Sequence, residues 1–284
     1  MLWFLGVMGL ALVGWGIFSA REILYPERST APPPHPLPTY TTHLLQTPGA
    51  YPLNVWRLEV PAPRARLLIF HGYHANRYQV LGIAAALRER GYESLLFELR
   101  GHGDRPGPCT FGLKEADDAD AVLQWLRDTT PGEWVPMGVL GLSMGAALAC
   151  QVAWRHAEVQ AVVADSVYSR FYPIVRFSIQ RRYRLPAWPW AWVTWCGVRI
   201  ALRRRTRWLN PLALAPQLRQ PLLAIQGGHD DVVPSSESDA FYQRWGGPKE
   251  RWFEPAAAHV EAFTLNPQTY TNRVAEFFDR TLRS

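Results

Sequence analysis

Short apolar segments alternate with helical apolar stripes along most of the chain. Runs rich in Leu, Ile and Val, each short enough for one strand, recur between turns. The predicted strands span residues 53–60, 64–70, 94–99, 137–140, 159–164, 222–227 and 250–253. Apolar residues recur at helical spacing within residues 80–91, 114–127, 144–156 and 268–282. This alternation predicts an α/β fold, a mostly parallel sheet with helices on both faces.

The N-terminal segment differs from this pattern because residues 2–18 carry no charged side chain. A run of this length is at the lower limit for a helix that spans a membrane. As a signal peptide it is poor, since no Lys or Arg precedes it and Phe18 stands where a small residue is preferred before cleavage. We expect residues 1–25 to be an uncleaved membrane anchor, with a removed signal segment or a buried soluble helix as alternatives. The flanking charges do not decide the side of the membrane.

A Pro-rich linker is predicted between the anchor and the body. Residues 26–52 include three consecutive prolines at positions 32–34, and such segments are stiff and extended. The body, residues 53–284, is long enough for one domain with a large core, and an apolar content of 48% fits a folded chain. The oligomeric state does not follow from these features.

Residues 166–220 have an unusual composition. They hold eleven Arg, no Asp or Glu, and five of the thirteen Trp residues. The whole chain carries a formal charge of +6, so the remainder is net acidic and the basic character belongs to this one segment. Because the segment lies between two predicted strands, we expect an inserted cap or lid over the sheet.

The Trp and Arg residues of this cap allow three interpretations. In the first interpretation, the aromatic rings pack on the body and the arginines are solvated. Alternatively, the cap faces a membrane, since Trp favours the headgroup level and Arg is attracted to anionic lipid. The same mixture also suits single-stranded nucleic acid, but no nucleic-acid partner is expected because no recognised binding module accompanies the charge. The interaction expected of this chain is therefore membrane contact through the N-terminal helix and the cap.

The cysteines give no sign of a metal site or of a disulfide framework. Cys109, Cys150 and Cys196 lie far apart and lack the close spacing of zinc ligands. An odd number of cysteines gives no support to an oxidising compartment. We expect neither a metal nor a cofactor.

The segment Gly141-Leu142-Ser143-Met144-Gly145 follows a predicted strand and precedes a helix of small residues. A G-x-S-x-G pentad in this position is typical of a nucleophile elbow, in which glycines allow backbones to approach around a serine on a strained turn. The hydroxyl of Ser143 would then lie at a helix N-terminus, where free amides stabilise an oxyanion. The pentad is a weak signal until a base and an acid are found.

A downstream acid and base complete an ordered set. Ser143 is followed by Asp230 after one predicted strand and by His259 after the last, which is the order Ser, Asp, His. In these motifs the chain from about residue 53 to its end resembles the α/β-hydrolase superfamily, and within it the bacterial esterases and serine-aminopeptidase-like members. The blocks that carry the resemblance are residues 70–73, 97–103, 110–112 with Glu115 and Asp118, 141–145, and 227–230. The chain departs from the family at Glu98, where Asp is usual, and at Ala257-Ala258, where a glycine is usual beside the histidine.

The resemblance implies an α/β-hydrolase fold with an inserted helical cap and a Ser-His-Asp triad. Ser143 would be the nucleophile, His259 the general base, and Asp230 the acid, because the family's G-x-x-D-x-x-V-P spacing falls on Asp230. Asp231 and Asp165 stay open as alternatives to Asp230. The backbone amides of Tyr73 and Met144 would hold the oxyanion. His71, His102, Glu115 and Asp118 are expected to be structural.

The expected function is a membrane-anchored serine hydrolase that cleaves an acyl ester through an acyl-enzyme. The apolar, cationic cap favours a small-molecule substrate with a lipid-like acyl chain, and thioesters remain open. Peptidase or amidase activity and acyl transfer are alternatives on the same fold. A non-catalytic body that binds membrane or a partner through the cap is the alternative from another class.

Overall fold

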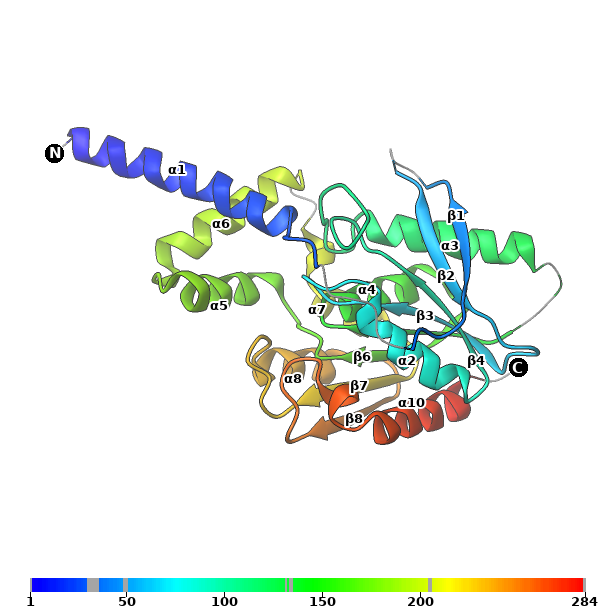
Figure 1. Cartoon of the computed structure of the whole chain (residues 1–284). Helices are drawn as coiled ribbons and strands as arrows, with labels where there is room; N and C mark the ends of the chain where they lie inside the picture. Colours follow the sequence, from blue (N-terminus) through cyan, green and yellow to red (C-terminus); the bar gives the residue numbers. More distant parts are fainter. Residues whose placement is uncertain are drawn as a thin grey trace.

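The sheet of this protein is mostly parallel. In the computed structural model, residues 2–29, 36–47, 51–130, 132, 135–203 and 206–282 are described. Within them, one eight-stranded sheet has the order β1-β2-β4-β3-β5-β6-β7-β8; β2 runs antiparallel to both its neighbours, β1 and β4, and all the other pairs are parallel (Figure 1). The strands are β1 (Thr41–Leu45), β2 (Leu53–Leu58), β3 (Ala65–Phe70), β4 (Tyr92–Phe97), β5 (Met137–Leu142), β6 (Val159–Asp165), β7 (Leu222–Gly227) and β8 (Lys249–Glu254).

Helices cover both faces of this sheet, as the alternating pattern predicts. In β3, Leu68 and Phe70 pack into the core shared with α3 and α4, whereas Leu67 and Ile69 pack into the core shared with α2 and α10. The predicted fold class, α/β with a mostly parallel sheet and helices on both faces, is confirmed. The helices of the body are α2 (Tyr78–Arg88), α3 (Glu115–Thr129), α4 (Met144–Arg155), α8 (Ser235–Arg244), α9 (Ala262–Leu265) and α10 (Pro267–Thr281).

The sheet begins inside the segment predicted as a linker. Strand β1 pairs antiparallel with β2, with Leu45 opposite Leu53, so the sheet starts at Thr41 and not at residue 53. The sequence analysis missed this strand because its residues are mostly exposed at the sheet edge, and therefore lack an apolar run. The remaining linker prediction falls partly on residues 30–35 and 48–50, which lie outside the described residues.

The cap segment connects β6 to β7 and consists of helices. Two of them, α5 and α6, project from one end of the sheet (left in Figure 1). Trp190 and Trp195 pack against neighbouring rings, whereas Trp188 and Trp192 are 76% and 54% exposed. Part of the cap therefore packs as an ordinary core and part presents aromatic surface. Its elements are α5 (Phe171–Tyr183), α6 (Ala187–Ala201), η1 (Arg207–Leu209), α7 (Pro211–Leu214) and η2 (Ala215–Gln217).

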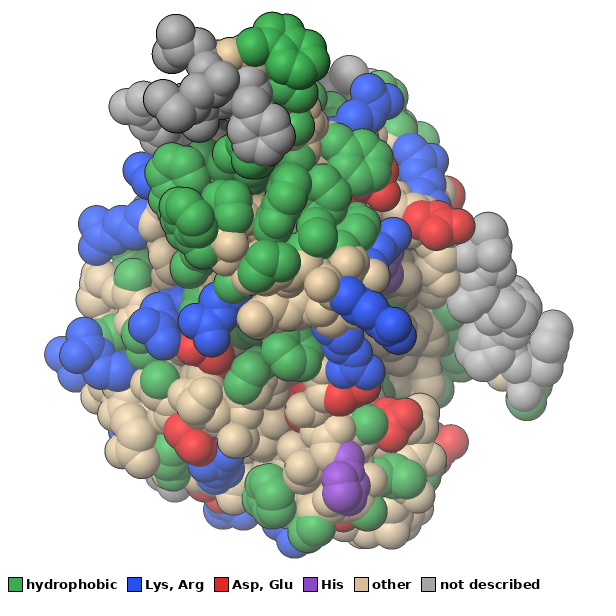
Figure 2. Space-filling model, turned by 90° about the vertical axis from the view of Figure 1, so that its left-hand side faces the viewer, with side chains coloured by type: hydrophobic (Ala, Val, Ile, Leu, Met, Phe, Trp, Pro, Cys, Tyr) green, Lys and Arg blue, Asp and Glu red, His purple; other side chains and the backbone are tan. Residues whose placement is uncertain are grey.

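The N-terminal apolar run forms the long helix α1 (Leu2–Leu24), which lies alongside α6 (Figure 1). Its segment Gly6–Leu24 is long and apolar enough to cross a membrane. Leu10 and Ile17 are exposed, but Ala20 and Leu24 are buried in the core of the cap and body. One end of α1 is therefore part of the folded unit, while the other presents apolar side chains (Figure 2).

Candidate active site

Ser143 occupies a strained turn between β5 and α4. Its φ of 52° and ψ of −112° are unfavourable for a residue with a side chain. The two glycines of the pentad explain why the turn can form: a Cβ at Gly141 would lie 2.1 Å from the Gly145 carbonyl oxygen, and one at Gly145 would lie 2.4 Å from that of Phe70. The Ser143 amide donates to the Asp165 carbonyl oxygen at 2.8 Å, which fixes the turn against β6.

His259 and Asp230 form a close pair. The Nδ1 atom of the histidine lies 3.0 and 2.9 Å from the two carboxylate oxygens of Asp230, and the Asp230 side chain is only 1% exposed. The amides of Val232 and Val233 also donate to this carboxylate, at 3.0 and 2.8 Å. Burial acts to raise the pKa of Asp230, but the hydrogen bond and charge of His259 and the two amides lower it overall. Asp230 is therefore held as an ionised acceptor.

Asp231, the neighbouring alternative, points to a different partner. Its carboxylate accepts from Arg181 of α5 at 2.6 Å, and both side chains are about half exposed. The structure thus brings Asp230 to His259 and leaves Asp231 at the cap. Such an exposed ion pair contributes little to stability.

The loop that carries His259 packs tightly on the end of β7. A Cβ at Gly227 would lie 2.4 Å from the Ala257 carbonyl oxygen, and one at Gly228 would lie 2.4 Å from that of Pro255. The His229 amide donates to the Ala257 carbonyl oxygen at 2.9 Å. Close approach therefore depends on glycines in the β7 loop, which explains how the histidine loop accommodates Ala257.

A cavity of about 690 Å³ joins the candidate residues. Ser143, Met144, Tyr73 and His259 all line it, with Asp230 behind the histidine. The structure therefore brings the five predicted site residues to one place. The rest of the lining is largely apolar and comes from the cap and from the loop before α3, and includes Phe111, Tyr168, Phe171, Ile174, Val175 and Ile179.

The backbone amides of Tyr73 and Met144 are the ones predicted to bind an oxyanion. A Cβ built on Gly72 would lie 3.6 Å from the Cβ of Ser143, so the loop after β3 passes directly beside the serine. The Gly72 amide is already used, since it donates to the Gln79 side chain at 2.8 Å. Within the described residues, the next amide, of Tyr73, and that of Met144 at the start of α4 donate to no other group. Both stay free to bind an oxygen.

The phenol of Tyr73 is hydrogen-bonded to the backbone of α1. Burial is the main cause that raises the pKa of this hydroxyl, so it stays neutral and acts as a donor. It donates to the carbonyl oxygen of Ile23, in α1, at 2.8 Å. The Tyr73 ring stacks on Phe111 with a centroid distance of 5.3 Å. These contacts fix the residue that offers the amide.

His71 and His102 support the loops around the site. The Leu99 amide donates to His71 Nε2 at 3.0 Å, while the other ring nitrogen lies 2.8 Å from the Gly72 carbonyl oxygen. Burial lowers the pKa of His102 to about 3, which keeps that ring neutral. Neither ring lines the cavity, within the part of the chain described. Both arrangements are those of structural residues.

The departure at Glu98 has a local structural account. Its carboxylate accepts from the Arg77 amide at the start of α2, at 2.6 Å. A Cβ at Gly103 would lie 1.7 Å from a Glu98 carboxylate oxygen, so the longer side chain requires glycine there.

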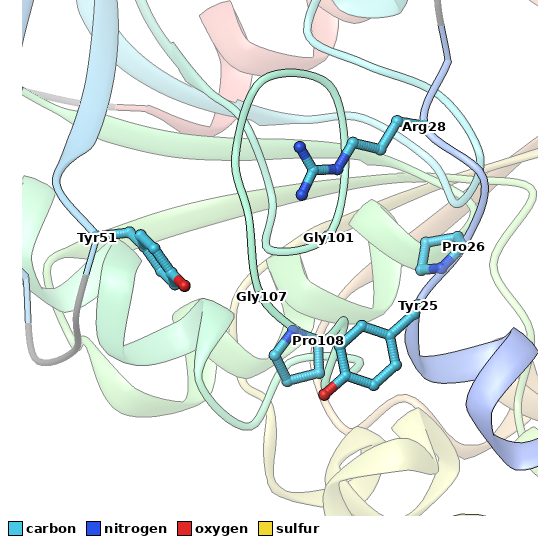
Figure 3. A pocket seen from close by; sticks show the side chains of 7 residues that line it. All are labelled: Tyr25, Pro26, Arg28, Tyr51, Gly101, Gly107 and Pro108. Atoms are coloured by element: carbon cyan, nitrogen blue, oxygen red, sulfur yellow. The ribbon is translucent and has the colours of Figure 1, made fainter.

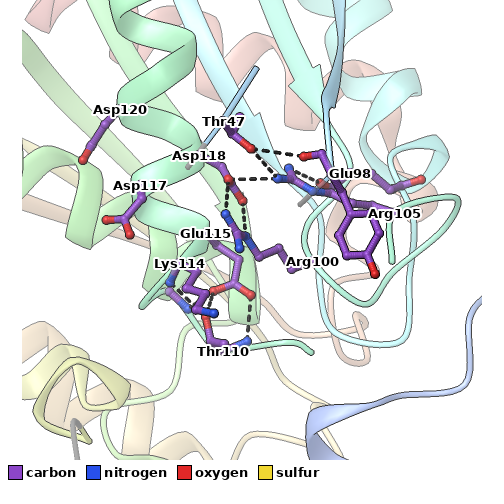
Figure 4. A network of polar contacts seen from close by, with 12 residues as sticks. Thr47, Glu98, Arg100, Arg105, Thr110, Lys114, Glu115, Asp117, Asp118 and Asp120 are labelled. Carbon is purple, nitrogen blue, oxygen red and sulfur yellow. Dashed lines mark hydrogen bonds and ion pairs between the residues drawn. The ribbon is translucent and has the colours of Figure 1, made fainter. Parts of the chain in front are cut away.

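A network of polar contacts supports the loop before α3 (Figure 4). Glu115 accepts from the amides of Thr110 and Gly112 at 2.7 and 2.9 Å, and Asp118 accepts from Arg100 and Arg105 at 2.6 and 2.9 Å. These buried carboxylates hold the loop that carries Phe111 into the cavity. They bind loop groups and do not contact Ser143 or His259.

Among the described residues, Asp165 makes no hydrogen bond to His259, and its buried carboxyl destabilises the fold when it ionises. Its carboxylate accepts from the Ser166 hydroxyl at 3.0 Å, and burial raises its pKa from 3.8 to about 6. Because this folded-state pKa lies above the ordinary one, ionisation destabilises the native state as pH rises from about 4 to 6.

Asp165→Asn should therefore raise the free energy of unfolding by roughly 1–3 kcal/mol at pH 8. The gain should shrink toward zero below about pH 3, where the carboxyl is protonated in both states. The amide oxygen can still accept from Ser166. Denaturant unfolding of both proteins at the two pH values measures the gain, and an equal effect at both would contradict this account of the buried carboxyl.

Three wall residues of the cavity were not foreseen. Ser19, Glu22 and Ile23, near the C-terminal end of α1, line it together with Ser143 and His259. No sequence signal marks them, because an apolar run of this kind predicts a membrane-spanning helix and says nothing about what its end contacts.

No cluster of His, Cys, Asp and Glu able to hold a metal ion occurs among the described residues.

A mostly parallel sheet with a serine on a strained turn after its central strand is the architecture of one class of enzymes, the α/β-hydrolases. The chain belongs to that superfamily. Within it, the family described as serine aminopeptidase, S33, matches residues 61–195. The matched range includes the turn of Ser143 but ends before Asp230 and His259.

Bacterial and archaeal proteins are similar to this chain in sequence or in structure. The chain is 29% identical to the protein YqkD of Bacillus subtilis, over 75% of this chain and 70% of that one. Among solved structures, the esterase Pf2001 of Pyrococcus furiosus has a TM-score of 0.76 and 27% identity, over 92% of this chain and 99% of that one. The acylaminoacyl peptidase of Pyrococcus horikoshii, at 17% identity and a TM-score of 0.68 over 86% of this chain and 42% of that one, shares the fold. The protein is thus a hydrolase of the α/β-hydrolase fold.

Proposed function

We propose that this protein is a serine hydrolase that cleaves acyl esters through a covalent acyl-enzyme. The observation that carries the proposal is that Ser143 and His259 line one cavity while Asp230 binds the far side of the histidine ring. The Oγ of Ser143 attacks the ester carbonyl carbon, and its proton passes to Nε2 of His259. The negatively charged oxygen of the tetrahedral intermediate accepts hydrogen bonds from the backbone amides of Tyr73 and Met144.

The same histidine completes the reaction in both halves. The imidazolium of His259 gives its proton to the leaving alcohol as the carbon–oxygen bond of the ester breaks. A water molecule then attacks the acyl-serine, loses a proton to Nε2, and the carboxylic acid leaves as Ser143 recovers its proton. The Nδ1–H donates to ionised Asp230, which keeps the lone pair of Nε2 directed away from the carboxylate.

The lining of the cavity favours an acyl chain. Val175 and Ile179 of α5 and Phe171 at its start present apolar surface to the cavity that Ser143 also lines. Burial of such surface stabilises a bound hydrocarbon at about 0.8 kcal/mol per methylene. The similarity to an esterase supports the same class of substrate. An amide or peptide is the second candidate, because the family that matches residues 61–195 is described as serine aminopeptidase.

Hydrolysis of a p-nitrophenyl ester series, from acetyl to palmitoyl, by the full-chain protein tests this proposal. We expect turnover of the esters, with longer acyl chains preferred until the cavity is filled. An amino-acid p-nitroanilide serves as the amide comparison. Turnover of the anilide without turnover of any ester would replace the esterase assignment with the peptidase one.

We further propose that α1 anchors the protein and that α1 and α6 together contact an anionic lipid bilayer. Exposed apolar side chains occupy both helices, and basic side chains lie around them (Figure 2), which in the cap are all Arg. The apolar side chains would be buried among the lipid acyl chains, and the cationic side chains would bind the lipid phosphates. The exposed side chains are Trp3, Val7, Met8, Leu10, Val13, Ile17 and Phe18 of α1 and Trp188, Trp192 and Ile200 of α6.

Arg199→Gln should weaken binding of the full chain to phosphatidylserine-containing vesicles about fivefold at low salt, since one interfacial cation contributes about 1 kcal/mol. Arg199 is exposed near the end of α6. Arg244→Gln, an exposed arginine of α8, is the matched control and should have no effect. Vesicle flotation measures binding. Equal losses in the two variants, or equal binding to neutral vesicles at high salt, would count against contact through α6.

A further inference from the structure

Helix α1 packs on α6 through small residues at close range. A Cβ at Gly197 of α6 would lie 2.4 Å from the Gly16 carbonyl oxygen and 2.9 Å from the Cβ of Ala20. A Cβ at Gly16 would lie 3.1 Å from the Val193 carbonyl oxygen. Gly16 and Ala20 are four residues apart, the spacing with which helices approach closely in membranes. The small residues at this contact therefore allow the backbones of α1 and α6 to approach closely.

Polar contacts fix the register of the two helices. The Trp15 indole donates to the Thr194 hydroxyl at 3.0 Å, and the hydroxyls of Ser19 and Thr194 lie 2.8 Å apart. Ser19 and Thr194 are 2% and 0% exposed, so these bonds lie in a dry interface. Each hydroxyl also donates to a carbonyl of its own helix, Ser19 to Trp15 and Thr194 to Trp190. Shifting either helix would therefore cost the Trp15 indole its acceptor, a loss that apolar packing alone would not impose.

The C-terminal end of α1 is bound to the catalytic body. Its last carbonyls lack partners inside the helix, and groups of the body supply them: the Tyr73 hydroxyl donates to Ile23 at 2.8 Å, and the Cys109 amide donates to Leu24 at 2.7 Å. The segment just after α1 lies against the loop between β4 and α3 (Figure 3). A second cavity of about 410 Å³ there is lined by Tyr25, Pro26, Arg28, Tyr51, Gly101, Gly107 and Pro108.

We propose that α1 is a permanent wall of the catalytic cavity and selects the length of the acyl chain, in addition to any contact with the bilayer. Ser19, Glu22 and Ile23 line the cavity that holds Ser143 and His259, and the contacts at both ends of this stretch hold it there. The selection role rests on the proposed esterase function. Removal of α1 would open the cavity on that side and expose the α6 surface that Gly16 covers.

Gly16→Leu tests this wall, with Gly14→Leu as its matched control. Both changes add the same apolar side chain to α1, but Gly16 meets α6 whereas a Cβ at Gly14 has no neighbour within 4 Å. For the ratio of kcat/KM on lauroyl to that on butyryl p-nitrophenyl ester, we expect a fall of about tenfold or more in Gly16→Leu, as lost contact with a few methylenes gives. Gly14→Leu should keep the wild-type ratio.

Ile23→Trp is a second variant, at a residue that lines the cavity and is not part of the close contact of Gly16 and Ala20 with Gly197. A larger side chain on the wall should fill the cavity and lower the same ratio, while butyryl ester turnover persists. Wild-type ratios in both Gly16→Leu and Ile23→Trp would overturn the wall. A wild type that hydrolyses no ester would instead refute the proposed function, and with it the selection role.

Discussion

Ser143→Ala should lower kcat for p-nitrophenyl esters by about 10⁴-fold or more, because without the hydroxyl no acyl-enzyme forms. Residual hydrolysis would come from the oxyanion amides and binding alone, since the alanine keeps the cavity and the backbone. The substitution removes only the hydroxyl and keeps the Cβ, so the strained turn with its φ of 52° is unchanged. Folding is therefore expected to be retained, as circular dichroism would show.

Ser236→Ala is the control for this change. Ser236 is an exposed serine of α8, outside the cavity lining. Its substitution should leave kcat within about twofold, which is the range of an uninvolved surface position. Wild-type turnover by Ser143→Ala would remove the nucleophile from the proposed mechanism.

Asp230→Asn should lower kcat by about 10⁴-fold with little change in KM. The carboxylate accepts from Nδ1–H of His259, whereas an asparagine amide placed there can donate to the ring and select the wrong tautomer. The geometry is kept, so the loss reports protonation and charge. Steady-state kinetics on one good ester measures it.

Asp231→Asn is the matched neighbour for that experiment. Its carboxylate accepts from Arg181 of the cap and not from His259, so the change should cost less than about tenfold, the scale of an exposed pair. If Asp231→Asn were the more damaging of the two, the assignment of the acid to Asp230 would be wrong.

The turn at Ser143 was predictable because its requirements are local. The glycines of the pentad are needed within one turn, where a Cβ at Gly141 or Gly145 would strike backbone at 2.1 and 2.4 Å. Sequence spacing carries that information directly. The choice between Asp230 and Asp231 was not local: spacing favoured the first, and only the positions of His259 and Arg181 separate them.

Two features of the fold were beyond the pattern of apolar residues. Strand β1 has no apolar run because it forms an exposed edge, and its pairing with β2 is a long-range contact. The contacts of α1 are of the same kind. An apolar sequence long enough to span a membrane has the same pattern whether the helix is free or bound to Tyr73 and Thr194. The place of α1 in the cavity wall therefore depends on tertiary contacts that the pattern does not contain.

Treatment of the wild-type full chain with a fluorophosphonate, followed by mass spectrometry of its peptides, tests the central claim most directly. The reagent forms a stable bond to an activated serine and mimics the tetrahedral intermediate. We predict a single adduct on Ser143, absent from Ser143→Ala. An adduct on another residue, or no adduct on an ester-hydrolysing protein, would contradict the account.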